Sequence, residues 1–254
     1  MDLLLDKIGL VAGVANKYSI AWKITQTWYE NGANLIFTCR NNDRREEVEN
    51  LVHSLDESFP VIPCDVEDDD DIEDLFEFIE EEYGRLDIML HSIAFAPKTA
   101  LQDSFVNLTR DDFLKTFDVS VYSLIAFARG ASRLMSEGGS IQTITYIGSE
   151  KVIPNYNVMG PAKAALESAV RYLAVDLGGK NIRVNAISSG SFNTVSARGI
   201  PGFRTMLDED AEAAPLARNI DSEDLGNASV YLASDLSSAV TGEILHVDCG
   251  IHLL

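Results

Sequence analysis

Residues 8–20 of the chain read Ile-Gly-Leu-Val-Ala-Gly-Val-Ala-Asn-Lys-Tyr-Ser-Ile, an apolar run that ends at Gly13 and leads into a helical pattern. A glycine at a strand end, followed by a turn and a helix start, presents unpaired backbone N–H groups and the positive end of a helix dipole to an anion. Only one of the three glycines of the usual G-x-G-x-x-G pattern is present. The stretch therefore predicts a βα unit, and both a structural turn and a phosphate-binding turn fit it.

The same alternation continues along the chain, with short apolar or β-branched runs between helical patterns, as is typical of repeated βαβ units. The predicted strands cover residues 8–13, 34–38, 60–64, 86–93, 140–146, 183–187 and 243–247. The predicted helices cover residues 19–31, 42–55, 69–83, 109–136, 155–177, 203–210 and 222–234. No linker rich in Pro, Gly or Ser separates them. The sequence thus predicts one α/β domain over residues 1–254, a doubly wound Rossmann-type fold with a seven-stranded parallel sheet.

The composition is that of a globular interior under an acidic surface. Hydrophobic residues make up 46% of the 254 residues, while 40 Asp and Glu against 20 Lys and Arg leave a formal net charge of -20. Such a surface repels phosphate polymers and anionic lipid, which argues against nucleic-acid binding and membrane docking. Any anionic ligand needs a local cationic or backbone N–H site.

The three cysteines, Cys39, Cys64 and Cys249, are too few and too scattered for a disulfide framework or a zinc site. We therefore expect no bound metal and a reduced, cytoplasmic compartment. The N-terminal residues do not resemble a targeting signal, and no apolar run approaches the ~20 residues of a membrane span.

The acidity is concentrated in residues 67–82, where eleven of sixteen residues are Asp or Glu. Apolar residues recur there at helical spacing, namely Ile72, Leu75, Phe76, Ile79 and Tyr83. This pattern predicts a solvated amphipathic helix rather than a disordered tail. A charged outer face without a specific partner is the simplest interpretation of it.

Two strand ends carry candidate nucleotide-binding residues. Arg40 follows the second strand, at a position where NAD-specific folds commonly carry an acidic residue, and Arg44 and Arg45 lie close by. Guanidinium groups there would suit a 2′-phosphate and favour NADPH, although ion pairs with neighbouring glutamates on the helix surface also explain them. Asp65, after the third strand, fits two roles, an acceptor for the adenine amino group or a helix cap.

Tyr156 and Lys163 lie seven residues apart in a predicted helix, which would place them two turns apart on one face. An ammonium beside a tyrosine favours the ionised phenolate, so the pair can act as an acid or a hydrogen-bond donor. Such a pair is also common without any role. Tyr146, at the end of the fifth strand, lies on the ligand side of a parallel sheet, where edge packing alone would also account for it.

These residues together resemble the pattern of the short-chain dehydrogenases/reductases, with a nucleotide-binding first unit and a Tyr-x6-Lys pair. More narrowly, the chain resembles, from end to end, the bacterial NAD(P)H-dependent enoyl-acyl-carrier-protein reductase. The motifs that carry this resemblance are Gly13 with Ser19-Ile20, Cys64-Asp65-Val66, His91-Ser92-Ile93-Ala94-Phe95-Ala96-Pro97, Tyr146, Asn155-Tyr156-Asn157-Val158-Met159-Gly160, Lys163, and Arg183-Val184-Asn185-Ala186-Ile187-Ser188.

The resemblance implies reduction of trans-2-enoyl-acyl-carrier-protein thioesters by hydride from NADPH or NADH, in fatty acid elongation, by a cytoplasmic homotetramer. It implies that Tyr156 donates a hydrogen bond to the thioester carbonyl, that Lys163 holds the nicotinamide ribose, and that Tyr146 lines the acyl pocket and supports Tyr156. Ala96 would contact substrate. The implied cofactor-binding residues are Gly13, Ser19, Ile20, Arg40, Asp65, Val66, Ile93, Lys163, Phe192, Asn193, Thr194, Val195 and Ser196.

The chain departs from the family pattern at three places. Residues 189–194 read Ser-Gly-Ser-Phe-Asn-Thr where the family usually has Ala-Gly-Pro-Ile-Arg-Thr, in a segment of about residues 191–210 that we expect to be mobile and to bind substrate. Pro161 lies between the catalytic positions, where we expect a local adjustment of the helix. Of the basic surface that the family offers to the carrier protein, only Arg204 and Arg198 remain, which predicts weaker docking at low salt.

Two other functions stay open at this stage. A ketoacyl reductase would use the same Tyr and Lys plus a serine about a dozen residues earlier, where this chain has Thr143 and Ile144. A non-catalytic nucleotide-binding relative is supported only by the altered 189–194 segment. The strong acidity, with eight Lys beside twelve Arg, adds the hypothesis of adaptation to high salt.

Overall fold

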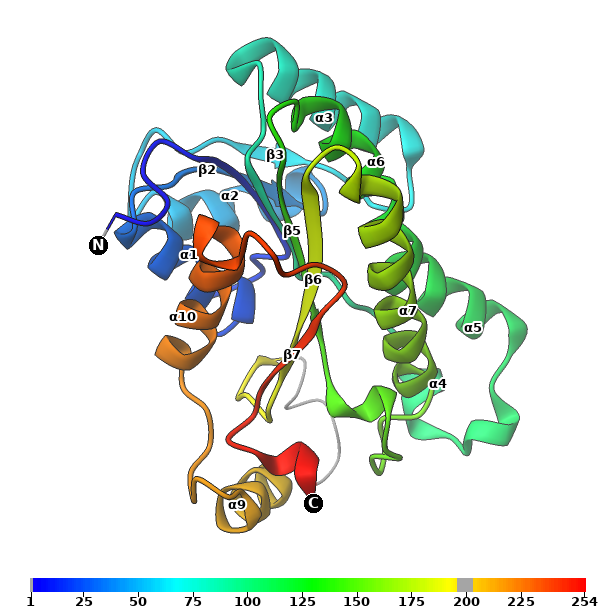
Figure 1. Ribbon diagram of the computed structural model, residues 1–254. Helices are drawn as coiled ribbons and strands as arrows, with labels where there is room; N and C mark the ends of the chain where they lie inside the picture. The colour runs from blue at the N-terminus through cyan, green and yellow to red at the C-terminus, as the bar shows by residue number, and fades with distance from the viewer. Residues whose placement is uncertain (1, 196–202) are drawn as a thin grey trace.

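The computed structural model describes residues 2–195 and 203–254. Its centre is one seven-stranded sheet in the order β3-β2-β1-β4-β5-β6-β7, in which every neighbouring pair is parallel (Figure 1). The strands are β1 (Ile8–Ala12), β2 (Asn34–Cys39), β3 (Val61–Pro63), β4 (Ile88–His91), β5 (Gly139–Thr145), β6 (Ile182–Ser189) and β7 (Ile244–Val247). The predicted fold class is confirmed, and each predicted strand is present with ends shifted by at most a few residues.

Helices cover both faces of the sheet (Figure 1). They are α1 (Ile20–Glu30), α2 (Asn42–Val52), α3 (Asp69–Tyr83), α4 (Lys98–Gln102), α5 (Arg110–Phe117), α6 (Ser123–Leu134), α7 (Met159–Gly178), α9 (Phe203–Ala213) and α10 (Ser222–Ala233). Residues from α3, α6 and α7 pack in one apolar core, and residues from α1, α2 and α10 pack in the other. Because the sheet is covered on both faces, its strands are almost continuously apolar.

The helix predicted over residues 109–136 is three segments rather than one. A π-helical turn at Asp118–Tyr122 separates α5 from α6. Hydroxyl groups bond backbone carbonyls four residues earlier on both sides of it, from Thr116 to Asp112 and from Ser123 to Val119. Such bonds compete with the regular helix ladder and bend it. Periodicity alone did not reveal this interruption.

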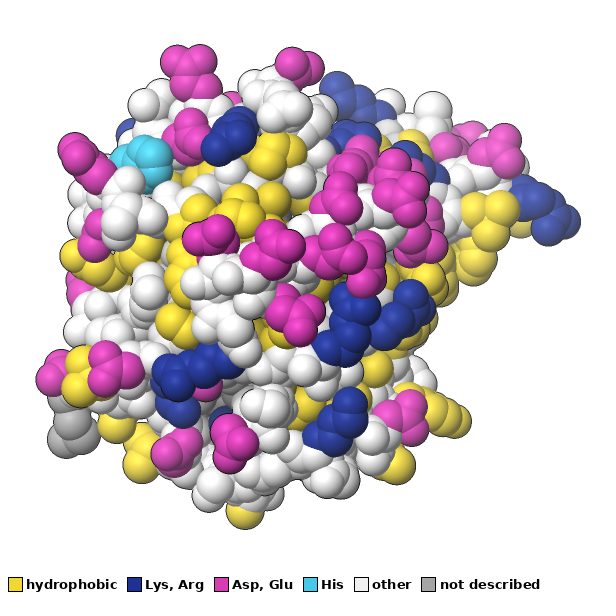
Figure 2. Space-filling model, turned by 90° about the horizontal axis from the view of Figure 1, so that it is seen from above, with side chains coloured by type: hydrophobic (Ala, Val, Ile, Leu, Met, Phe, Trp, Pro, Cys, Tyr) yellow, Lys and Arg dark blue, Asp and Glu magenta, His cyan; other side chains and the backbone are white. Residues whose placement is uncertain are grey.

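The acidic segment forms α3, as predicted. Asp68 caps its start by accepting a hydrogen bond from the Asp70 N–H, and Gly84 ends it in the left-handed conformation. Its apolar stripe, which includes Ile72 and Phe76, is buried against the core. Figure 2, which views the molecule from the end where α3 lies in Figure 1, shows acidic side chains gathered on this surface with a few Lys and Arg beside them. The charge run is therefore the solvated face of a core helix.

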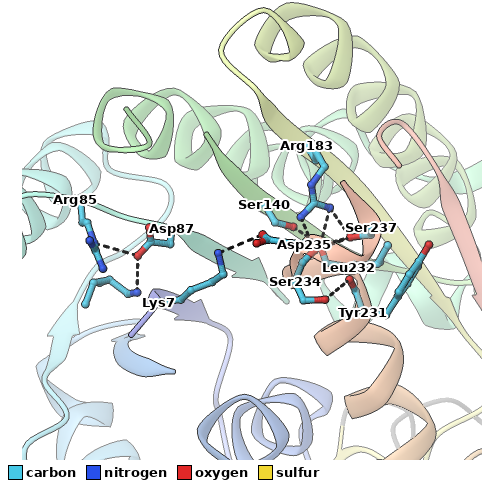
Figure 3. Close-up of polar contacts among 11 residues, drawn as sticks. Lys7, Arg85, Asp87, Ser140, Arg183, Tyr231, Leu232, Ser234, Asp235 and Ser237 are labelled. Atoms are coloured by element: carbon cyan, nitrogen blue, oxygen red, sulfur yellow. Dashed lines mark hydrogen bonds and ion pairs between the residues drawn. The ribbon is translucent and has the colours of Figure 1, made fainter. Parts of the chain in front are cut away.

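The amino-terminal edge of the sheet is closed by polar contacts (Figure 3). Arg183, at the start of β6, donates to the Leu232 carbonyl and to Ser237 Oγ, each at 2.7 Å. The Asp87 carboxylate accepts from the Ile8 N–H, also at 2.7 Å, and so joins the starts of β1 and β4. With this edge occupied, the carboxyl ends of the strands form the open edge. The strand order reverses there between β1 and β4, which is where open parallel sheets bind ligands.

In residues 2–195 and 203–254, the helices are too short or too polar to cross a membrane. The same residues bring together no cluster of metal-ligating side chains, and the three cysteines are buried free thiols.

Candidate functional site

A cavity of about 960 Å³ opens at the carboxyl edge of the sheet. It is lined by residues at or directly after the ends of the six strands β1 to β6, so it brings together segments that are distant in sequence. Of the predicted residues, it contains Gly13, Ser19, Ile20, Arg40, Arg44, Asp65, Val66, Ile93, Ala96, Tyr146, Tyr156, Lys163, Phe192, Thr194 and Val195. Arg45 and Asn193 are not among its lining residues in the described part of the chain, and Ser196 lies outside the described residues.

The turn after β1 is built around a glycine that no other residue could replace. Gly13 has φ +109°, and a Cβ placed on it would lie 2.1 Å from the Ser92 carbonyl oxygen. The two central strands therefore approach each other closely at the switch point. Ser19 caps α1 with its hydroxyl, which accepts from the Trp22 N–H and donates to the Asn16 carbonyl. The turn is needed for the close approach of the two strands. It also places the start of α1 at the cavity, as a phosphate site requires.

The predicted cationic cluster is largely neutralised. Arg44 contacts Glu47 and Arg45 contacts Glu49, each at 2.7 Å along α2, so the surface ion-pair interpretation is confirmed for both. Arg40 lies 3.5 Å from the Asp65 carboxylate and 3.6 Å from that of Glu67. Arg40 and Arg44 still line the cavity, but carboxylates compensate their charge, which weakens the sequence argument for NADPH.

Asp65 does not cap the following helix, because Asp68 does so. The Asp65 carboxylate instead accepts a hydrogen bond from the Glu67 N–H at 3.2 Å, beside Arg40. Its backbone N–H is held by the Asp71 carboxylate at 2.8 Å. The cap interpretation is therefore wrong, and the carboxylate remains at the cavity wall.

Tyr156 lies in a turn, and not within a helix as predicted. Helix α7 begins only at Met159, because Asn155 and Asn157 have φ of 63° and 42°. Asparagine tolerates this left-handed conformation, which a continuous helix excludes. The Asn157 side chain secures the turn by donating to the Asp103 carbonyl at 2.8 Å. The turn brings Tyr156 against Tyr146 while Lys163 remains on the helix.

The two tyrosine rings meet edge to face, with centroids 5.1 Å apart. Gly148 makes room for this contact, since a Cβ there would lie 2.6 Å from the Tyr156 ring. Burial raises the pKa of Tyr156 well above its ordinary value, with a smaller contribution from Tyr146. Tyr156 is therefore a neutral phenol and a hydrogen-bond donor, and the predicted shift towards phenolate is outweighed by desolvation.

Lys163 is buried, with 6% of its surface exposed, and donates to the Ile144 carbonyl at 2.7 Å. Burial lowers the pKa of this ammonium to about 8, an effect that the negative charge of Glu167 opposes. Lys163 is thus mainly charged near neutral pH, and it lies at the end of β5 in the cavity that both tyrosines line.

His91, from the motif at residues 91–97, is fully buried, and it is not among the residues that line the cavity in the described part of the chain. Its ring nitrogens lie 3.3 Å from Thr143 Oγ1 and 2.8 Å from Ser123 Oγ. Burial, with Lys163 nearby, lowers its pKa to about 3, so the ring is neutral. In the same motif, Phe95 is tied to Ser120 of the π-helical turn, whose hydroxyl accepts from the Phe95 N–H and donates to its carbonyl, both at 3.0 Å.

The departures from the family pattern are accommodated locally. Pro161 is the third residue of α7, where the backbone nitrogen has no helical partner in any case, so it costs no helix hydrogen bond. Ser191, in place of the usual proline, donates to the Asp210 carboxylate and so ties this segment to α9. Arg204 is exposed on α9, and Arg198 lies outside the described residues.

Three residues contribute to the site without having been predicted from the sequence, namely Ser120, Gly148 and Glu167. Ser120 supports residue 95 from a position 25 residues away in sequence, which no local pattern reveals. Glu167 had a usable signal, because it is an acidic residue four positions after Lys163 and so lies on the same face of the helix.

Comparison with known proteins agrees with this geometry. A family model described as enoyl-(acyl carrier protein) reductase matches residues 13–252. The chain belongs to this family. Curated members include the NADH-dependent reductase 1 of Rhizobium meliloti, 48% identical over 98% of this chain and 92% of that protein. The NADPH-dependent reductase of Staphylococcus aureus is 46% identical over 99% and 98%.

A solved structure of the Bacillus cereus enoyl-acyl carrier protein reductase, with NADP+ and indole naphthyridinone, has a TM-score of 0.98 to this chain. The two are 47% identical, and the match covers 100% of this chain and 99% of that one. Membership of the reductase family therefore rests on full-length similarity of both sequence and fold.

Proposed function

We propose that this chain reduces the trans-2 double bond of enoyl thioesters carried by acyl-carrier protein, with NADH or NADPH as hydride donor. The observation that carries the proposal is the cavity itself. Its lining includes the start of α1, Arg40 and Asp65, which are candidates for nucleotide binding. It also includes Tyr146, Tyr156 and Lys163, the catalytic candidates. A nucleotide-binding turn and an acid-base group thus share one space.

The residues present fit a nicotinamide dinucleotide. The start of α1 offers N–H donors for the pyrophosphate, and Arg40 and Asp65 add polar groups to the lining of the cavity. Buried Lys163 has an ammonium suited to ribose hydroxyls, and Thr194 and Val195 line the same cavity. When bound, the cofactor supplies the hydride that adds to the β-carbon of the substrate.

The role of Tyr156 follows from its protonation. As hydride adds, negative charge develops on the thioester oxygen, and a donor placed there stabilises the transition state. Burial keeps Tyr156 a phenol that can donate to that oxygen. Tyr146 packs on its ring and fixes its direction, while the Lys163 ammonium adds a positive field. Gly148 permits the approach of the two rings.

The structure favours this reaction over ketoacyl reduction. The position where that chemistry needs a serine holds Thr143, which is buried and donates to the His91 carbonyl at 3.0 Å, away from the cavity. A non-catalytic relative is disfavoured because all three catalytic candidates lie together in the cavity.

The experiment is a direct assay. Purified protein with crotonyl-CoA or a longer trans-2-enoyl thioester should oxidise NADH or NADPH, followed at 340 nm. Tyr156→Phe should lower kcat by about 10²- to 10³-fold, the usual cost of removing one oxyanion donor. Tyr231→Phe, on α10, is the matched control and should keep wild-type kcat. Absence of turnover with either cofactor would refute the proposal.

The choice of cofactor is tested separately by Arg40→Gln. If the Arg40 guanidinium meets a 2′-phosphate, the variant should raise KM for NADPH by about tenfold and leave KM for NADH nearly unchanged. An equal change in both constants would show that Arg40 serves only its contacts with Asp65 and Glu67.

We further propose a homotetramer in the cytoplasm. Exposed apolar side chains on α5 and α7, among them Leu114, Tyr172 and Val175, support burial against other copies of the chain. The free buried thiols support a reduced compartment. Light scattering coupled to gel filtration tests the assembly, and a Tyr172→Glu variant should lower the molar mass.

A further inference from the structure

Glu167 is a buried carboxylate directly behind the catalytic residues. It lies on α7 one turn after Lys163, so the two side chains share a face of the helix, and only 5% of its surface is exposed. Thr145 and Lys163 line the cavity, whereas Glu167 is not among the lining residues in the described part of the chain. It therefore does not contact the reacting groups itself.

Glu167 and Lys163 are hydrogen-bonded to the last two residues of β5. Glu167 Oε1 accepts from Thr145 Oγ1 at 2.7 Å, and Lys163 Nζ donates to the Ile144 carbonyl at 2.7 Å. Ile144 and Thr145 are the two residues directly before Tyr146. One helix thus fixes the backbone that presents Tyr146 to Tyr156.

We propose that Glu167 is a positioning residue for the reduction, which holds the end of β5 and keeps Lys163 in its ammonium form. The inference rests on the reductase activity proposed above. A buried carboxylate costs free energy unless it is paired and hydrogen-bonded. The Thr145 hydroxyl and the nearby Lys163 charge together provide that compensation.

Among the groups around Lys163, Glu167 is the carboxylate that raises the pKa of its ammonium. Burial alone lowers the pKa of Lys163, and Glu167 raises it again, to give a value of about 8. From β4, His91 faces Lys163 as a neutral ring, because its own pKa is about 3. Burial raises the pKa of both Tyr146 and Tyr156, and Glu167 adds to the rise for Tyr156. Asp210 on α9 acts on Tyr146 rather than on Lys163.

The test is the pH profile of Glu167→Gln, which keeps an oxygen for Thr145 and removes the charge. Since kcat/KM for NADH reports the free enzyme, its alkaline limb in wild type marks the loss of the Lys163 ammonium. Without the carboxylate, that limb should move to lower pH by about one unit. The rate should therefore fall about tenfold above the wild-type midpoint and approach the wild-type rate on the acidic side.

Two controls separate charge from packing. Glu167→Asp retains the charge, so its alkaline limb should return towards the wild-type position. Because glutamine keeps an acceptor for Thr145, a loss of the same size at every pH, or an unmoved limb, would show that the carboxylate does not control the charge of Lys163 and would overturn the inference. An inactive wild type would refute the proposed function, which is a distinct outcome.

Should Glu167→Gln fail to fold, the wild-type enzyme carrying ¹³C-labelled glutamate provides the measurement. The Glu167 carboxyl resonance, assigned by its loss in Glu167→Asp, should shift with the same midpoint as the alkaline limb of kcat/KM. A carboxyl resonance that does not respond to that titration would overturn the inference.

Discussion

At the scale of single residues, the site depends on how closely side chains approach one another. Tyr156 can pack against Tyr146 only because residue 148 has no side chain. Its neutral phenol is a consequence of burial, and so is the lowered pKa of Lys163. Desolvation, more than any single neighbouring charge, sets the chemistry of these groups.

Gly148→Ala tests this close approach. The new Cβ would lie 2.6 Å from the Tyr156 ring, so the ring must move. A displacement near 1 Å at a reacting group costs up to about 10²-fold in rate, and we expect kcat to fall by about 10- to 100-fold. Gly178→Ala is the control, since a Cβ at that position would meet nothing within 4 Å. Equal kcat values for the two variants would contradict the prediction.

At the scale of elements, each end of a helix or strand decides which side chains reach the cavity. The start of α7 at Met159 frees Tyr156 from the helix, and the π-helical turn places Ser120 under Phe95. Two carboxylates close to the start of α3 have different positions and roles. Asp68 caps the helix, whereas Asp65 lines the cavity.

Asp68→Ala should therefore affect stability, and Asp65→Asn should affect nucleotide binding. Loss of the Asp68 cap should lower the free energy of unfolding by about 1 kcal/mol, which is about 2–4 °C in Tm for a chain of this size. Asp65→Asn should keep Tm and raise KM for the nucleotide. Thermal unfolding and steady-state kinetics on both variants check this, and a Tm loss confined to Asp65→Asn would refute the assignment of the cap.

At the scale of the whole molecule, the net charge of -20 opposes the binding of an anionic cofactor, and it would repel a carrier protein of the same sign. Local positive groups favour binding of the cofactor, because Arg40, Lys163 and the start of α1 all line the cavity. At the surface expected to bind the carrier protein, Arg204 is exposed and is the one expected basic residue that lies within the described part of the chain. Salt should therefore assist docking of the carrier protein.

Raising the ionic strength from 0.01 to 0.15 M shortens the screening length from about 30 to about 8 Å. We expect KM for an enoyl-acyl-carrier-protein substrate to fall several-fold over this range at saturating cofactor. A neutral enoyl-N-acetylcysteamine thioester should show little change. A KM for the carrier-linked substrate that rises with salt would indicate attraction and contradict the prediction. Activity retained at molar salt would support salt adaptation.

The sequence by itself determined the βαβ order, the parallel sheet, the amphipathic α3 and the Tyr-Lys pair, because each is written in local periodicity or in a short motif. Most of the site residues predicted from the sequence and its family resemblance also line the cavity. Only the tertiary structure decided that Tyr156 precedes its helix, that Asp68 is the cap, and that Glu47 and Glu49 engage two of the arginines. Left-handed asparagines, competing carboxylates and burial act through contacts in space, and the protonation of Tyr156, Lys163 and His91 follows from those contacts.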